Sequence, residues 1–180
     1  QGLSEERNWR YEGAAQLYEK AVEEDPLLVP ARMGLALYLY RTGRYAEALE
    51  HFNSCVEIEQ FKPGARYYRG LTQLRLGREQ EGESDLWFAA RFPAYQAPAS
   101  CSLARLCLRR GQFGEAESVL RGALEESPED PEMQGLLIAT LRRSGMQEKA
   151  RARVQEQLTE HPLFPLFHAE LLFLKGTDAT

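Results

Sequence analysis

The sequence predicts an all-α protein, a solenoid built from 34-residue helix–turn–helix repeats. Four glycines recur every 34 residues, at Gly43, Gly77, Gly111 and Gly145. Small and large apolar residues recur with the same period, with no insertion or deletion over four periods. Within each segment the apolar residues are three and four positions apart, which is typical of helices with one buried face. No sustained alternation of period two indicates a strand.

The recurring columns have distinct packing roles. The first small-residue column contains Ala14, Ala48, Gly82, Ala116 and Ala150, and the second contains Gly2, Ala36, Gly70, Ala104 and Ile138. The large apolar column contains Tyr18, Phe52, Leu86, Leu120 and Val154. Small residues allow two helices to cross closely, and a large side chain fills the space beside the crossing. Because Gly82 stands in a column of alanines, we expect Gly82→Ala to be neutral or to stabilise the fold by up to about 1 kcal/mol.

The helices follow in order along the chain. The partial repeat 1–28 contains the end of a first helix, to about Arg7, and a second helix over 11–24. Four complete repeats span 29–62, 63–96, 97–130 and 131–164, and a trailing helix spans 165–175. This arrangement predicts eleven helices. The recurring glycine ends each first helix, since glycine adopts the left-handed conformation cheaply, and prolines such as Pro26 and Pro128 mark the turns between repeats. We expect residues 1–180 to form one domain and to be a fragment of a larger protein.

The segments "GRYAEALEHFNSCVEIE" and "GQFGEAESVLRGALEESPED" closely resemble the tetratricopeptide repeat (TPR) family. The resemblance covers nearly the whole chain and implies a right-handed α-α superhelix that binds other proteins. It also implies that first helices line a concave groove and second helices form the convex back. Arg32 and Arg69 depart from the family, which often has apolar or aromatic residues there. A looser similarity, in "EDPLLVPARMGLALYLYRTGRYAEAL", is to the TPR block of large bacterial proteins with β-rich domains of unknown, possibly carbohydrate-related, function.

Composition and motifs argue against a catalytic or metal-binding site in this sequence. The hydrophobic fraction is 43%, and no apolar run is long enough to cross a bilayer. The three histidines and three cysteines show no metal-binding or catalytic spacing, and Cys101 and Cys107 lie about 240° apart around a helix. We therefore predict no catalytic residue, metal or cofactor, and no enzyme activity. The low cysteine count favours a reducing, cytoplasmic compartment.

Charge is strongly divided between the two kinds of helix. The first-helix segments of repeats two to five carry twelve arginines and one acid, Glu132, whereas the second-helix segments carry 22 acids and 7 bases. The formal net charge of −5 conceals this division. Arg41, Arg75, Arg109 and Arg143 recur every 34 residues, each in the last turn of a helix, where a cation also stabilises the helix dipole by about 0.3–1 kcal/mol. Helix capping and ligand binding are therefore two alternative roles for these four arginines.

A basic groove with apolar positions suits an extended acidic peptide or a partner domain. The candidate binding residues are Met33, Leu37, Tyr40, Arg41, Tyr67, Arg69, Leu71, Leu74, Arg75, Arg105, Leu108 and Arg109. The resemblance excludes a chaperone tail of the Glu-Glu-Val-Asp type, because the Lys and Asn residues of that clamp are missing. A membrane is not an expected partner, and nucleic acid is a poorer fit because the total charge is acidic. The alternatives are an accessory region of a larger enzyme, and a structural spacer or self-assembly segment.

Overall fold

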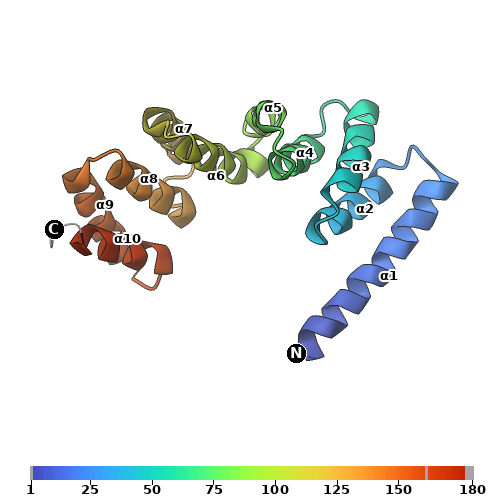
Figure 1. Ribbon diagram of the computed structural model, residues 1–180, viewed down its shortest axis with the longest axis horizontal. Coiled ribbons are helices and arrows are strands. Elements are labelled where there is room, and N and C mark those ends of the chain that lie inside the picture. The colour runs from blue at the N-terminus through green and yellow to red at the C-terminus, as the bar shows by residue number, and fades with distance from the viewer. Residues whose placement is uncertain (1, 161, 177–180) are drawn as a thin grey trace. The chain divides into compact units, whose positions relative to one another are not determined.

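The computed structural model describes residues 2–160 and 162–176, with side chains over 12–160 and 162–174, and the regular secondary structure of this part of the chain is all helix, with turns between the helices (Figure 1). The first compact unit, residues 1–89, contains α1 (Gly2–Glu24), α2 (Val29–Arg41), α3 (Tyr45–Ile58), α4 (Pro63–Arg75) and α5 (Glu79–Ala89). The second unit, residues 90–180, contains α6 (Pro93–Arg109), α7 (Phe113–Glu126), α8 (Pro131–Arg143), α9 (Gln147–Glu160) and α10 (Pro165–Gly176). None of the described helices is long and apolar enough to cross a membrane.

The turns inside the repeats confirm the predicted helix pairs. The four recurring glycines have φ values between 74° and 84°, the left-handed region. In every case the residue after the glycine donates its N–H to a carbonyl five positions earlier, as Arg44 does to Leu39 at 2.9 Å. This is the bond that closes a helix C-terminus around a left-handed glycine. The pairs α2–α3, α4–α5, α6–α7 and α8–α9 therefore share one turn geometry.

The prediction of a break near the start of the chain is wrong. α1 is a single helix over Gly2–Glu24, so the described chain has ten helices and not eleven. The reason lies in the repeat itself. Thirty-four residues before Gly43 the sequence has Trp9, and a bulky residue disfavours the left-handed conformation that ends the other first helices.

In repeats two to five the predicted small and large apolar columns form the core of both units, whereas Tyr18 in the partial repeat is 39% exposed. Ala48, Phe52 and Leu86 are fully buried in the first unit. Leu120 and Val154 are fully buried in the second, within a cluster that also contains Met133 and Leu137 from α8. Burial of apolar surface along one face of each helix is what holds successive helices together.

The α4–α5 crossing is closer than the columns alone indicate. A Cβ atom on Gly82 would lie 2.8 Å from the carbonyl oxygen of Gly70 and 3.0 Å from the side chain of Leu74. In turn, a Cβ atom on Gly70 would lie 2.9 Å from the carbonyl oxygen of Gly82. The two backbones touch because repeat three alone has glycine in both small-residue columns. The expectation that Gly82→Ala is neutral or stabilising is therefore wrong.

We predict instead that Gly82→Ala lowers the free energy of unfolding by about 1–3 kcal/mol, because the new methyl group meets backbone that cannot move alone. The matched control is Gly122→Ala in α7, where a Cβ atom meets nothing within 4 Å. That control is expected to be neutral or to stabilise by up to about 1 kcal/mol. Urea denaturation of the two variants measures the difference. Equal stability of the two would show that the crossing can relax.

Candidate protein-binding surfaces

Several polar side chains near the start of first helices bind the preceding turn. In each case the side chain contacts the carbonyl oxygen six residues earlier. The contacts are Arg32 Nε to Pro26, Arg66 Nε to Gln60, Gln134 Nε2 to Pro128 and His168 Nε2 to Pro162, at 2.5, 3.2, 2.7 and 2.6 Å. These bonds join a first helix to the turn between repeats. The basic character of Arg32 and Arg66 therefore has a structural explanation.

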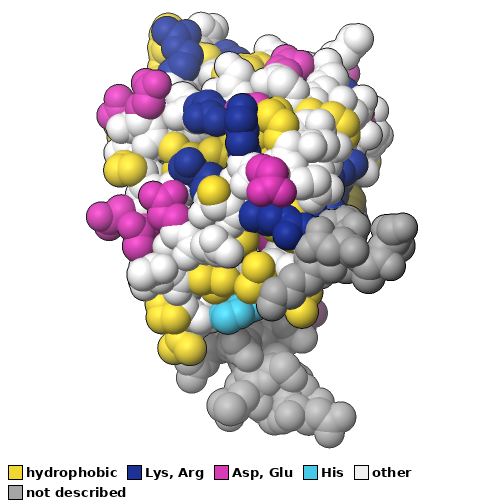
Figure 2. All heavy atoms as spheres, turned by 90° about the vertical axis from the view of Figure 1, so that its left-hand side faces the viewer, with side chains coloured by type: hydrophobic (Ala, Val, Ile, Leu, Met, Phe, Trp, Pro, Cys, Tyr) yellow, Lys and Arg dark blue, Asp and Glu magenta, His cyan; other side chains and the backbone are white. Residues whose placement is uncertain are grey.

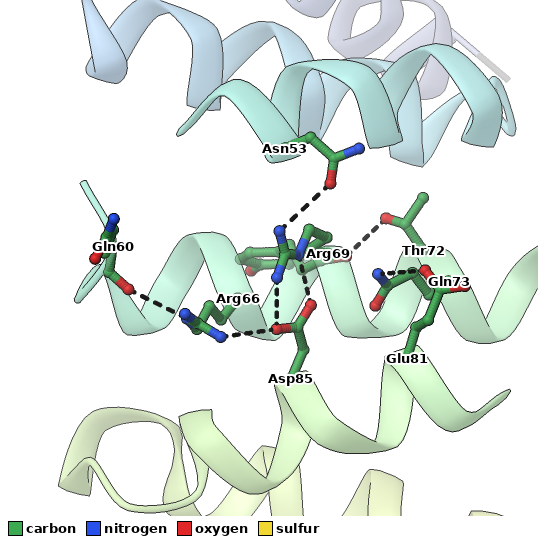
Figure 3. Close-up of polar contacts among 9 residues, drawn as sticks. Asn53, Gln60, Arg66, Arg69, Thr72, Gln73, Glu81 and Asp85 are labelled. Carbon is green, nitrogen blue, oxygen red and sulfur yellow. Dashed lines mark hydrogen bonds and ion pairs between the residues drawn. The ribbon is translucent and has the colours of Figure 1, made fainter. Parts of the chain in front are cut away.

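Arg69 is part of an ion pair within the helix pair α4–α5 (Figure 3). It stands at the position that Leu35, Leu103 and Leu137 occupy in other repeats, and those leucines are buried. Its Nε lies 2.6 Å from Oδ2 of Asp85 and its Nη2 lies 2.8 Å from Oδ1.

The Asp85 carboxylate has further support. Asp85 is only 3% exposed, and Arg66 Nη1 also lies 3.3 Å from its Oδ1. On the other side Arg69 donates from Nη1 to Asn53 of α3 at 3.4 Å (Figure 3). Three helices thus meet around one arginine. Arg69 is committed to this network, so we do not carry it into the proposed binding surface.

Other arginines of the first-helix segments are also paired. Arg44 pairs with Glu47, Arg105 with Glu132, and Arg142 with Glu170, the last at 2.7 Å and well shielded from solvent. The side chains of Arg105 and Glu132 are both about half exposed, and such exposed ion pairs contribute little to the free energy of unfolding. On the face in Figure 2, Lys and Arg side chains are interspersed with acidic and hydrophobic ones. The sequence excess of arginine is therefore larger than the positive charge available to a ligand.

A surface of different character lies on α2 and α4, which contact each other. We call it the α2–α4 surface. It comprises Met33, Leu37, Tyr40 and Arg41 of α2 with Tyr67, Leu71, Leu74 and Arg75 of α4. The six apolar and aromatic side chains are partly exposed and both arginines are exposed. This arrangement leaves apolar side chains within reach of a ligand beside positive charge.

Tyrosines join the two helices of the α2–α4 surface. The Tyr40 ring packs edge-on against Tyr68 at 6.3 Å between centroids, and Tyr67 packs against Tyr68 at 5.0 Å. The side chain of Arg75 is hydrogen-bonded to Tyr40, which raises the pKa of Arg75. Tyr45 of α3 also packs edge-on against Tyr40, with 5.5 Å between ring centroids. Sequence reasoning missed Tyr68 and Tyr45 as members of this cluster. The available signal was that seven of the eight tyrosines fall within residues 1–89.

The corresponding helices of the second unit have fewer exposed apolar residues. Leu108 is buried and belongs to the core, while Arg105 and Arg109 are exposed. Cys101 and Gly135 occupy the positions of Met33 and Tyr67. Cys101 is buried, and the side chain of Leu166 from α10 lies against Gly135. The predicted residues of α6 therefore do not form a surface like that on α2 and α4.

Two of the three cysteines lie in environments that keep their thiols protonated. Burial raises the pKa of the Cys55 thiol to about 11 and that of Cys101 to about 12, so neither is a thiolate near neutral pH. Residues 12–160 and 162–174 contain no group of three or more His, Cys, Asp or Glu side chains placed to hold a metal ion.

Comparison with known proteins identifies the fold. Two family models, both described as tetratricopeptide repeat, match residues 1–63 and 94–169, which together are more than half of the chain. The protein belongs to the tetratricopeptide repeat family, whose members generally mediate protein–protein interactions. No curated protein matches the chain.

Comparison with solved structures finds the same fold. MamA is 17% identical with a TM-score of 0.77, covering 88% of this chain and 93% of its own. YrrB, described as a TPR protein with an unusual peptide-binding site, is 18% identical with a TM-score of 0.71, covering 92% and 85%. The type IV pilus biogenesis factor PilW is 22% identical with a TM-score of 0.74, covering 90% and 75%. At these identities the similarity establishes the fold alone.

The next repeat shows how the Arg69–Asp85 pair could be replaced by apolar residues. At the equivalent positions α6 and α7 have Leu103 and Val119. Arg69→Leu and Asp85→Val should each lower the free energy of unfolding by about 2–4 kcal/mol, since each deprives a shielded charge of its closest ionic partner. The double variant Arg69→Leu/Asp85→Val should be close to wild type or more stable. Chemical denaturation of the wild type, the two single variants and the double variant measures these differences as a double-mutant cycle. A double variant as unstable as the sum of the single losses would contradict this account.

Proposed function

We propose that the protein is a non-catalytic scaffold and that its α2–α4 surface binds an extended, acidic segment of a partner protein. The observation that carries this proposal is the combination of partly exposed tyrosine, leucine and methionine side chains with exposed arginines, on two helices that contain no Asp or Glu. Apolar anchors supply affinity, and an opposite charge selects the partner and speeds its approach.

We infer an acidic ligand from the arginine side chains of α2 and α4 that are exposed to solvent. Of the five arginines of α2 and α4, Arg32 and Arg66 bind the turns before their helices and Arg69 pairs with Asp85. Arg41 and Arg75, at the helix C-termini, are the two exposed ones. A segment with acidic residues flanking an aromatic or aliphatic residue matches this pattern. The family supports a peptide ligand, since YrrB is itself described as having a peptide-binding site.

The test uses a panel of short synthetic peptides: acidic with aromatic residues, acidic without them, and basic with them. The first class should bind, and its affinity should fall as salt rises, because exposed charges are screened beyond about 8 Å at physiological ionic strength. Arg41→Glu/Arg75→Glu and Tyr67→Ala should each weaken binding about tenfold or more. Isothermal titration calorimetry measures the affinities, and thermal denaturation measures stability.

Matched controls separate binding from helix capping. Arg105→Glu/Arg109→Glu makes the same charge change on α6, and Glu50→Arg changes an exposed residue of α3. Neither should alter the affinity. If Arg41 and Arg75 only complement the helix dipoles, their reversal will lower the melting temperature without changing the affinity of any peptide in the panel. That result would contradict the proposal that the α2–α4 surface binds an acidic segment.

A further inference from the structure

The α2–α4 surface presents hydrogen-bond donors and few acceptors. Its polar side chains are those of Tyr40, Arg41, Tyr67 and Arg75. An arginine side chain carries five N–H donors and no acceptor. A tyrosine hydroxyl can accept as well as donate, but that of Tyr40 already accepts from Arg75. The surface is therefore matched to a ligand that supplies acceptors.

The other polar side chains of α2 and α4 do not correct this imbalance. Neither helix contains Asp, Glu or Asn. Thr72 is buried, and its hydroxyl donates to the Tyr68 carbonyl at 2.6 Å (Figure 3). Gln73 is buried too, and its Nε2 lies 3.4 Å from Oε2 of Glu81. Over residues 29–41 and 63–75, both described in full, there is thus no carboxylate and no exposed amide that a ligand can donate to.

This imbalance distinguishes between the two polar groups of a ligand backbone. An extended segment brings a C=O and, except at proline, an N–H at every residue. Its carbonyls match the tyrosine and arginine donors. An N–H that faces the helices loses its water without gaining an acceptor, which weakens binding. A ligand with proline at those positions avoids that loss, because proline has no N–H.

The tyrosine rings of this surface are held in place by the core. Tyr68 stacks on the fully buried Phe52, with 6.1 Å between ring centroids and 11° between ring planes. The rings of Tyr40 and Tyr67 both pack edge-on against Tyr68. Rings that are fixed before binding lose little conformational freedom when a ligand packs on them, so they favour affinity.

Fixed aromatic rings beside hydrogen-bond donors suit the polyproline II conformation. Proline-rich segments in this conformation dock onto aromatic-lined surfaces in several unrelated kinds of domain. A polyproline II helix has no internal hydrogen bonds, so all of its carbonyls remain able to accept. Binding by strand addition has no counterpart here, because the described residues of the first unit form helices and turns and offer no sheet edge.

We propose that the segment bound by the α2–α4 surface is acidic, contains proline and adopts the polyproline II conformation. Its prolines pack against the rings of Tyr40 and Tyr67, and its carbonyls accept from the hydroxyls and guanidinium groups of the surface. Its acidic residues lie beside Arg41 and Arg75. We thereby name the ligand class for the site of the proposed function, on which this inference rests.

The experiment is isothermal titration calorimetry of the 180-residue chain with three capped peptides. The parent is Glu-Pro-Phe-Glu-Pro-Phe-Glu-Pro-Phe, in which the three residues per turn of polyproline II place each residue type along one edge. The second peptide has alanine in place of every proline, and the third has N-methylalanine. The alanine peptide should bind about tenfold more weakly than the parent or worse, and the N-methylalanine peptide, which also lacks the N–H, should recover most of that loss.

Variants of the protein locate the effect on the surface. Tyr67→Ala should bring the affinities of the parent and alanine peptides closer together, because a ring that contacts proline is lost. Arg41→Leu/Arg75→Leu removes two charges without adding an acceptor, so it should weaken both peptides by a similar factor. The matched aromatic control is Trp87→Ala on α5, which should change neither affinity, since Trp87 is 44% exposed but lies outside the surface.

The outcomes separate this inference from the proposed function. An alanine peptide that binds as tightly as the parent would overturn the inference and leave the proposed function standing. A tighter alanine peptide would point to a helical ligand, whose N–H groups are bonded internally, and would overturn it as well. An N-methylalanine peptide as weak as the alanine peptide would also overturn it, because the missing N–H is its basis. If no acidic peptide binds at all, the proposed function is contradicted and the inference falls with it.

Discussion

The third repeat depends on the contact between the backbones of α4 and α5 at Gly70 and Gly82. With no side chain on either residue, each carbonyl oxygen approaches the other glycine closely. Asp85 lies one turn after Gly82, and a Cβ atom on Gly70 would already be 3.2 Å from the Cβ of Asp85. The same approach brings the carboxylate within reach of Arg66 and Arg69. The ion-pair network is thus a consequence of the crossing, and a larger residue at either glycine would separate the acid from its bases.

The sequence predicted those features that a single column determines. A glycine with positive φ, an alanine at a crossing and a large apolar residue beside it each follow from a local steric rule. Features that depend on two columns at once were not predictable in that way, which is why the expectation for Gly82 was wrong. The continuity of α1 was predictable from one residue, because Trp9 stands in the column that has glycine in the four later repeats.

The candidate site shows why charge counted along a segment differs from charge on a surface. An arginine side chain is long enough to reach a neighbouring helix, so Arg69 of α4 pairs with α5 and Arg142 of α8 pairs with α10. Which arginines remain exposed, as Arg75 does, depends on the packing of neighbouring helices and not on the sequence of one segment. Among the apolar residues expected on the helix face that the core does not use, those of α2 and α4 are partly exposed, whereas Leu108 of α6 is buried.

In a repeat protein, the meaning of an exposed apolar side chain depends on its column. Phe61 is more exposed than Leu172, yet Leu27 and Leu163, in the same column between repeats, are 69% and 90% exposed. Exposure at Phe61 is therefore a property of the position. Leu172 differs, because Ala36, Ala104 and Ile138 in its column are fully buried. An apolar residue that is exposed where its equivalents are buried marks a face that a helix covers elsewhere in the fold.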